Sequence, residues 1–396
     1  MKFGQPPEDL DDSLPLEPMQ ISLLRGQKDV LKDFLTELVD THPTKLTKKQ
    51  RDDVRSVYRQ ILLNVIYNGV RRTYTAVPRG TQAFKEGSYW SKLGLTFRHT
   101  VAVLDRLSAD EYIIQMKGLY NGPGGFSRLS RIFGTDKLGD KTDLPKLAES
   151  IDFIWDDDAA PVVLTNFPYN ADVLGEDHPD VVRVKAINKF LKGFSWQQKG
   201  PIRLIYTGSP MHGGRVYSRF QNMPRELRKE LKISGKETVE LDYKANHLSM
   251  LVAMLGLPIP VDPYVEVAKK TNLSRDQIKT FVTAALGASS EGSAFGALKK
   301  YRFNKTMFER VRDALLSLYP GLPLFRGFGT TLQTLEGQIA LDIMFAGTKV
   351  GIPVLPVHDS FITTEDHKQW LLEQMKNQWA KHVKEGSRTS IEEKKK

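Results

Sequence analysis

Two aspartates each stand at the end of a short apolar stretch. Asp242 ends ETVELD, just before the helix-like NHLSMLVAMLG, and Asp359 lies in HDS between PVLPV and FITT. Carboxylates that meet on adjacent strands repel each other unless a divalent cation lies between them, which is the arrangement used for two-metal phosphoryl transfer. Each aspartate, taken by itself, also has a purely structural explanation. Asp242 could cap the following helix, and Asp359 could form hydrogen bonds within its turn.

A pair of cations strengthens the interpretation as a phosphoryl-transfer site. The segment SRDQIKTFVTAALG predicts a helix with Arg275 and Lys279 four residues apart, and therefore on one face. Cations in this arrangement suit a triphosphate and the charge that develops on leaving pyrophosphate. Together with the two aspartates they predict a nucleotidyl-transfer site that uses magnesium, which prefers oxygen ligands and substrate phosphates.

The elements that must position these residues lie in the second half of the chain. We expect a strand at 238–242 followed by a helix, and a hairpin of strands 354–357 and 361–363 with Asp359 at its tip. Upstream, arginines alternate with aromatic residues around Gly213 and Gly214. These glycines would allow the backbone to approach a ligand closely.

Taken in order, these motifs resemble the palm of the family A DNA polymerases over roughly residues 203–380. GGR and QN-P precede VELDY, VHDS resembles the family's VHDE, SRDQIK resembles its R-x-x-x-K helix, and TLEGQ resembles its QG-containing helix. The resemblance implies that Asp242 and Asp359 hold two magnesium ions, with manganese as an alternative. The backbone carbonyl of Tyr243 would be a further ligand.

The same resemblance implies roles for other side chains. Nucleotide contacts are implied for Arg275, Lys279, His247, Tyr264 and Thr283. Primer or template contacts are implied for His358, Arg215, Gln221, Arg228, Glu336 and Gln333. His247 stands where the family's DNA polymerases have a ribose-excluding glutamate, so the sugar of the incoming nucleotide stays open. The interval between the aspartates, 359 minus 242 or 117 residues, implies reduced fingers.

The first half of the chain predicts a different contact with nucleic acid. A short helix, a turn at Gly94, a second helix and two strands around NGPGG are typical of a winged helix. In that fold the second helix enters the major groove. The residues that would contact DNA are Thr96, Arg98, His99, Arg128 and Arg131. A helical hairpin packed on the polymerase half explains the same pattern equally well.

Composition narrows the classes of protein to consider. The net charge of +10 and pI near 9.4 favour a polyanionic partner, and the absence of cysteine excludes disulfides, thiolate metal sites and cysteine nucleophiles. No apolar run approaches the roughly 18 residues that a membrane span needs, and the acidic, proline-rich start does not resemble a signal peptide. We therefore expect a cytoplasmic protein with no membrane partner.

The expected fold class is α+β. A helical and winged-helix region would precede a right-hand polymerase palm, an antiparallel sheet with packed helices, with reduced fingers. The expected segments are a flexible arm at 1–20, a helical and winged-helix-like domain at 21–145, a linker or thumb-like region at 146–202, the palm and fingers at 203–385 and a charged tail at 386–396.

The leading hypothesis is template-directed primer extension on DNA with dNTPs, in the replication of a mobile element or phage. An RNA polymerase, a primase or a template-independent transferase stays open, as do rNTPs and an RNA template. A DNA-binding initiator or regulator with an inactive palm is the alternative from another class. Retention of both aspartates argues against it, because a carboxylate cluster is costly to keep without its cation. The sequence leaves the oligomeric state open.

Overall fold

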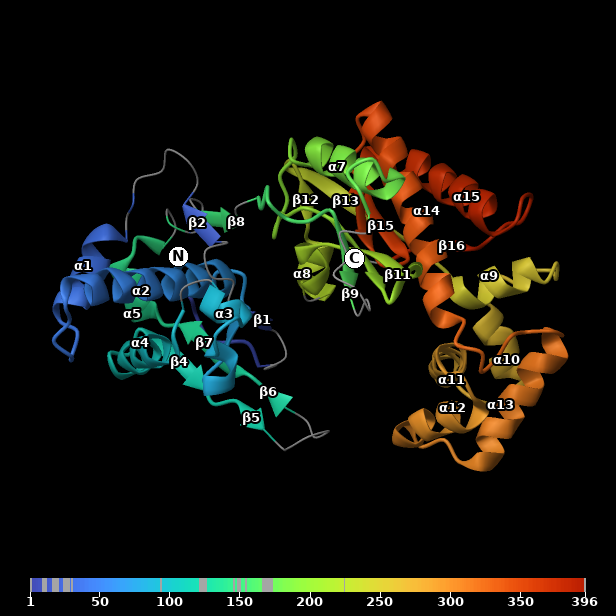
Figure 1. Cartoon of the computed structure of the whole chain (residues 1–396), viewed down its shortest axis with the longest axis horizontal. Coiled ribbons are helices and arrows are strands. Elements are labelled where there is room, and N and C mark those ends of the chain that lie inside the picture. The colour runs from blue at the N-terminus through green and yellow to red at the C-terminus, as the bar shows by residue number, and fades with distance from the viewer. Residues whose placement is uncertain are drawn as a thin grey trace. The chain divides into compact units, whose positions relative to one another are not determined.

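The chain forms two compact units, whose elements are labelled in Figure 1. The computed structural model describes residues 2–8, 13–15, 21–23, 29, 31–92, 95–120, 127–144, 147, 151–153, 155–165, 174–223 and 225–394. The first unit comprises Met1–Asp156, Gln197–Gly200 and Asn222–Arg228. The second unit comprises Asp157–Trp196, Pro201–Gln221 and Lys229–Lys396. The mixed content of helices and sheets agrees with the expected α+β class.

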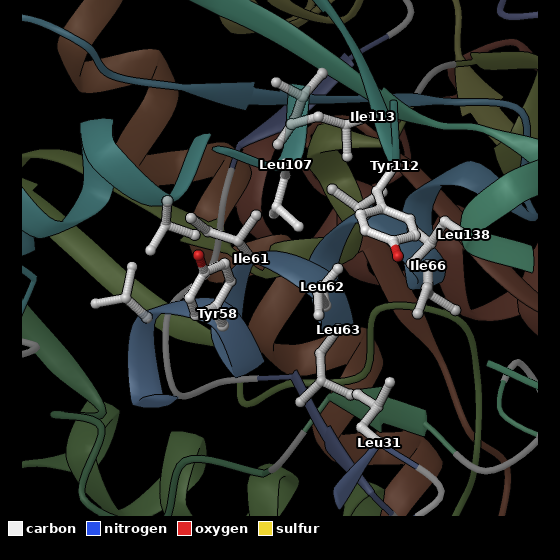
Figure 2. Close-up of a cluster of buried hydrophobic side chains, with 14 of the residues drawn as sticks. Leu31, Tyr58, Ile61, Leu62, Leu63, Ile66, Leu107, Tyr112, Ile113 and Leu138 are labelled. Atoms are coloured by element: carbon white, nitrogen blue, oxygen red, sulfur yellow. The ribbon is translucent and has the colours of Figure 1, made fainter. Parts of the chain in front are cut away.

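Helix α2 (Lys48–Gly69) is the centre of the first unit. It begins with a capping box between Thr47 and Gln50, and almost all of its second half is buried. Helices α1 (Lys32–Asp40) and α4 (Phe97–Ala109) pack against it. Figure 2 shows α2 side chains such as Ile61 and Ile66 in one cluster with Leu107 of α4. The helical segment expected at roughly 27–70 is therefore two helices.

A four-stranded sheet in the order β1-β3-β7-β4 completes this core. Its strands are β1 (Ser13–Pro15), β3 (Tyr74–Val77), β4 (Ile113–Met116) and β7 (Ser130–Gly134). The smaller elements of the unit are β2 (Ile21–Leu23), η1 (Thr81–Phe84), α3 (Tyr89–Lys92), β5 (Leu119–Tyr120), β6 (Ser127–Arg128), α5 (Asp136–Lys141) and β8 (Ile151–Phe153). The predicted turn at Gly94 and the NGPGG turn at 121–125 lie outside the described residues.

The flexible arm expected at 1–20 is wrong for the part of it that the structure describes. Strand β1 pairs in parallel with β3, and Phe3 is only 3% exposed. The ring of Phe3 meets the ring of Phe133 edge-on, and it lies so close to Gly69 and Gly134 that a Cβ at either glycine would collide with it. One aromatic side chain and two glycines therefore fix the segment, although its composition resembles that of a disordered arm.

The second unit is organised around strand β13 (Lys236–Tyr243). Strands β14 (Leu355–Val357) and β15 (Ser360–Thr364) form a hairpin, and β15 lies antiparallel to β13. Strand β12 (Lys232–Ile233) pairs with the beginning of β13. The strand and the hairpin predicted from the alternating apolar residues are thus confirmed, with boundaries shifted by at most two residues.

The charged tail expected at 386–396 is wrong in its central part. Residues Ile391–Glu393 form strand β16, which pairs antiparallel with the end of β13. The backbone N–H of Lys394 continues the ladder by donating to the carbonyl of Glu240 at 2.9 Å. Because β12 covers only the beginning of this edge of β13, the chain terminus supplies the hydrogen-bond partners beside Asp242.

A second sheet, in the order β11-β10-β9, packs with a long helix. Its strands are β9 (Val162–Thr165), β10 (Arg203–Thr207) and β11 (Ser209–Tyr217), and helix α14 (Gly329–Val350) lies along β11. A Cβ at Gly337 of α14 would come within 1.6 Å of the carbonyl oxygen of Gly214. The expectation that the glycine pair at 213–214 admits a ligand is therefore corrected, because Gly214 is in contact with a helix.

Helices complete the second unit around α14. Helix α7 (Pro179–Leu191) packs on α14, and β9 belongs to a sheet, so these parts of the expected linker at 146–202 are built into the unit. Figure 1 shows α10 (Pro263–Thr271), α11 (Arg275–Gly287), α12 (Glu291–Leu298) and α13 (Lys305–Leu318) gathered near the first turn of α14. The other elements are η2 (Arg219–Asn222), α8 (Arg225–Lys229), α9 (Asn246–Met254), η3 (Lys299–Tyr301), η4 (Glu365–His367) and α15 (Lys368–Val383).

Candidate active site

The pairing of β13 with β15 brings the two aspartates together. Asp242 lies opposite Ser360 in the ladder, and the N–H of Tyr243 donates to the backbone carbonyl of Asp359 at 3.3 Å. Asp359 stands in the two-residue turn that joins β14 to β15, after His358. Sequence reasoning placed both carboxylates correctly relative to their strands, and only the pairing of these strands places them at one point.

Unusual backbone conformations flank both aspartates. His358 has φ +58° and Ala245 has φ +48°, the left-handed region that side chains with a Cβ adopt at a cost. His358 immediately precedes Asp359, while Ala245 begins helix α9 three residues after Asp242. Neither position carries a glycine, which would remove the strain. Strain of this kind persists where the surrounding structure fixes a particular side-chain placement.

Burial makes the carboxylate pair costly to ionise. Burial, followed by the nearby negative charge of Asp359, raises the pKa of Asp242 to about 7, although Lys394 opposes the shift. Burial and then the charge of Glu336 raise the pKa of Asp359 as well. Both shifts have the sign expected for two carboxylates that share a poorly hydrated site.

The oxygen atoms of this pair fit a divalent metal. Oδ1 of Asp242 is buried and has no hydrogen-bond partner, so the structure leaves a carboxyl oxygen unsatisfied. Within the described residues, no group of three or more His, Asp and Glu side chains is arranged to hold a metal ion. Magnesium is nevertheless bound in many proteins by only one or two carboxylates together with water and substrate phosphates. Asp242 and Asp359 would hold it here.

These shifts predict how the stability of the metal-free protein depends on pH. Because the pKa of Asp242 is raised, the folded protein retains a proton that the unfolded chain loses near pH 4. This bound proton stabilises the folded state. Its contribution to the free energy of unfolding is complete below pH 4 and is lost as the pH rises through about 7, a change of about 2–4 kcal/mol. Urea unfolding at pH 5.5 and pH 8 in EDTA measures the loss, and Asp242→Asn should largely remove it. An equal pH dependence in both proteins would contradict the buried charge pair.

The predicted cationic face of α11 is present. Arg275, Lys279 and Thr283 follow one another at one-turn intervals, and Lys279 and Thr283 are exposed. The guanidinium of Arg275 donates from Nε to Asp262 at 2.7 Å, and Asp262 also caps α10 through Tyr264 N–H. This carboxylate holds Arg275 in a fixed orientation before any phosphate binds.

Tyr264 is placed differently from an exposed triphosphate ligand. Its side chain is buried, and the guanidinium of Arg275 lies 5.4 Å from its ring centroid. Burial and then the negative charge of Asp359 raise the pKa of the Tyr264 hydroxyl, so α10 lies close enough to the carboxylate pair to sense its charge. In this structure Tyr264 supports Arg275, and direct contact with a nucleotide stays a prediction.

Half-buried His247 and buried Glu336 form a polar pair beside the aspartates. Nε2 of His247 lies 2.9 Å from one carboxylate oxygen of Glu336, and Nε of Arg215 lies 2.9 Å from the other. Burial raises the pKa of Glu336, but the hydrogen bond and charge of His247, together with Arg215, outweigh burial and hold this pKa below its usual value. The template role implied for Glu336 and the primer role implied for Arg215 are untested, because their side chains bind each other here.

The remaining predicted contacts are dispersed. Gln221 donates to the carbonyls of Val216 and Pro356, so it joins β11 to the hairpin. His358 is exposed, and Gln333 is half-buried on α14 one turn before Glu336. Arg228 belongs to the segment that clusters with the first unit. These four roles stay predictions.

The side chains expected to contact DNA lie around α4 and the β6–β7 segment of the first unit. Thr96 caps α4 by accepting from the N–H of His99, and Arg98 is exposed in the first turn. Arg128 is half-buried. Arg131 is buried and donates to the carbonyl of Leu129, which leaves little of its guanidinium for a phosphate.

Two charged residues at the site were missed from the sequence. Glu240 lies two residues before Asp242, and alternation along a strand puts both side chains on one face, so this carboxylate was predictable. Lys394 lies 2.8 Å from Glu240 and 3.5 Å from Asp242. Nothing in the local sequence of Lys394 indicates this contact, because it depends on a strand pairing across some 150 residues of chain.

Comparisons with known proteins give one weak structural similarity. No family model matches the chain, and no curated protein matches it. Among solved structures it is similar to the POL domain of Pol1 from M. smegmatis in complex with DNA primer-template and dNTP, with 11% identity and a TM-score of 0.35. The match covers 94% of this chain and 66% of that one.

None of the helices in the described ranges is both long enough and apolar enough to cross a membrane.

Proposed function

We propose that this chain is a template-directed nucleotidyltransferase that extends a nucleic-acid primer with magnesium held by Asp242 and Asp359. The observation that carries the proposal is the buried carboxylate pair at the junction of β13 and β15, with Oδ1 of Asp242 unsatisfied. The nearby cationic face of α11 supports the same chemistry. A family A-like palm and reduced fingers are part of this proposal.

The residues of the chain would divide the work of the reaction. Magnesium, when bound, would lower the pKa of the primer 3′-hydroxyl and neutralise charge on the triphosphate. Asp242 and Asp359 would fix the reacting groups on a rigid strand pair, so that hydroxyl and α-phosphate meet in line. Lys279 and Arg275 would bind the outer phosphates and stabilise the charge that develops on pyrophosphate.

A prediction for the cationic face follows. Replacing Arg275 or Lys279 with alanine should lower kcat/KM for the incoming nucleotide about 10–100-fold, the value of one or two charge-assisted hydrogen bonds, because both phosphate binding and the charge developing on pyrophosphate lose a partner. Steady-state extension at varied nucleotide concentration measures kcat and KM. Lys269→Ala is the matched control, because Lys269 is an exposed lysine of neighbouring α10 that pairs with Glu266. An equal effect of the control variant would contradict the assignment.

Two alternatives have specific support. His247, in place of a ribose-excluding glutamate, favours rNTPs and an RNA polymerase or primase. The chain order α2, β3, α3, α4, β4, β7, with a sheet in the order β3-β7-β4, favours a winged helix, which would suit a DNA-binding initiator. In the proposed polymerase this unit would hold duplex DNA.

Ligand-dependent stability separates these functions. A polymerase should be stabilised by magnesium and nucleotide together, by about 2.7 kcal/mol at a ligand concentration 100 times the Kd, and a binding protein with an inactive palm should not. Thermal unfolding with magnesium and either dNTPs or rNTPs measures the effect and the sugar preference. No stabilisation by either set, together with stabilisation by duplex DNA, would contradict the proposed enzyme and favour the initiator.

A further inference from the structure

The C-terminal strand brings a lysine into the carboxylate cluster. In the β13–β16 ladder, Asp242 lies opposite Glu392, and the backbone of Lys394 bonds to that of Glu240. Side chains of residues paired in this way lie on one face of a sheet. The face that carries Asp242 therefore also carries Lys394.

The ammonium group of Lys394 has three oxygen neighbours. It lies 2.8 Å from Oε1 of Glu240, 3.2 Å from Oγ of Ser360 and 3.5 Å from Oδ2 of Asp242. The hydroxyl of Ser360 also donates to Glu240 at 2.6 Å. The lysine side chain is 29% exposed, while those of Glu240 and Asp242 are 15% and 19% exposed, so the contact is poorly screened by water.

Strand β16, which immediately precedes this lysine, has its own anchors. Lys244 pairs with Glu392 at 2.9 Å, and Lys368 of α15 pairs with Glu393. These pairs hold the two acidic residues of β16, while Lys394 extends toward the site. The acidic residues and the lysine of the terminus thus have different partners.

A cation at this place acts on the carboxylates as a metal would. It offsets the repulsion among them, and a positive charge a few ångströms from the site repels any divalent ion that enters. Oδ1 of Asp242 remains unsatisfied, so one lysine does not complete the coordination that the carboxylate oxygens can provide. Metal could then bind only against the field of this lysine or after its displacement.

We propose that Lys394 is a built-in counter-ion of the active site, which stabilises the metal-free protein and weakens metal binding. The C-terminal strand therefore sets the metal concentration at which the site is loaded. The inference rests on the proposed metal site at Asp242 and Asp359, and it assigns a role to the chain terminus that the polymerase mechanism does not require.

The test is a titration of the full chain with Mn²⁺ alone. The electron paramagnetic resonance signal of the free ion measures how much Mn²⁺ is bound. Lys394→Met, which keeps the length of the side chain and removes its charge, should bind Mn²⁺ about tenfold more tightly or better. Its melting temperature in EDTA should fall below that of the wild type. Lys394→Gln provides a second neutral variant should the first fail to fold.

Two controls separate charge from anchoring. Lys394→Arg keeps the charge and should leave the Mn²⁺ affinity near the wild-type value, whereas Lys368→Met removes an anchor of β16 that does not touch Asp242 or Glu240. Unchanged or weaker Mn²⁺ binding by both neutral variants, or equal tightening by Lys368→Met, would overturn the inference alone. Equal Mn²⁺ binding by the wild type and Asp242→Asn would instead contradict the metal site, and with it both proposals.

Discussion

Asp242→Asn and Asp359→Asn are each expected to reduce magnesium-dependent nucleotide addition by about 10³-fold or more. An amide keeps the shape of the side chain but loses the negative charge that a divalent cation needs. Because each carboxylate is buried beside the other and has a raised pKa, the neutral variants should fold as stably as the wild type, or more so, in EDTA. The activity would thus be lost without a loss of structure.

A matched control supports the interpretation of this result. Asp366 lies in η4 after β15, is exposed, and pairs with Lys236 away from the cluster. Asp366→Asn should therefore keep activity within about twofold of the wild type, as surface substitutions usually do. Activity of Asp242→Asn or Asp359→Asn close to that of Asp366→Asn would show that the chemistry takes place elsewhere. Extension of a labelled primer, with melting curves for all four proteins, measures these outcomes.

Gly337→Ala is expected to destabilise the protein by about 3 kcal/mol or more, at the upper end of the cost of overpacking. The added Cβ would overlap the carbonyl oxygen of Gly214, a backbone atom that cannot rotate away, so α14 and β11 must separate. Helix α14 carries Glu336, and β11 carries Arg215. Activity should therefore fall together with the midpoint of urea unfolding.

Gly296, on another helix, is a glycine at which an added methyl group should stabilise the protein. It lies inside α12, is exposed, and a Cβ there meets nothing within 4 Å. Gly296→Ala should stabilise the protein by about 0.5–1 kcal/mol, because alanine loses less conformational freedom on folding. If Gly337→Ala were as stable as the wild type, or were stabilised as Gly296→Ala should be, the close contact between α14 and β11 would be contradicted.

The parts of the site that the sequence predicted depend on local pattern. Alternating apolar residues predicted the strand before Asp242 and the hairpin that carries Asp359. Spacing of four residues predicted the face shared by Arg275 and Lys279. In each case the candidate site residue lies within a few positions of the strand or helix that positions it. The local sequence pattern therefore predicts both the residue and its element.

The parts that the sequence did not predict depend on distant partners. The segment SIEEKKK has the composition of a solvated, charged tail. Its strand forms because the edge of β13 provides backbone hydrogen-bond partners. Phe3 lies in a proline-rich arm, and its fixed position depends on Gly69 and Gly134. The position of Glu336 opposite His247 and Arg215 depends on how α14 packs, while its predicted template contact stays a prediction.

The most direct test of the central claim is single-nucleotide addition to a labelled primer on four templates that differ only in the first unpaired base. With magnesium, the wild-type protein should add the complementary nucleotide to each primer, and Asp242→Asn and Asp359→Asn should add none. Addition that ignores the template base would contradict template direction. No addition of any dNTP or rNTP by the folded wild-type protein would contradict the polymerase itself.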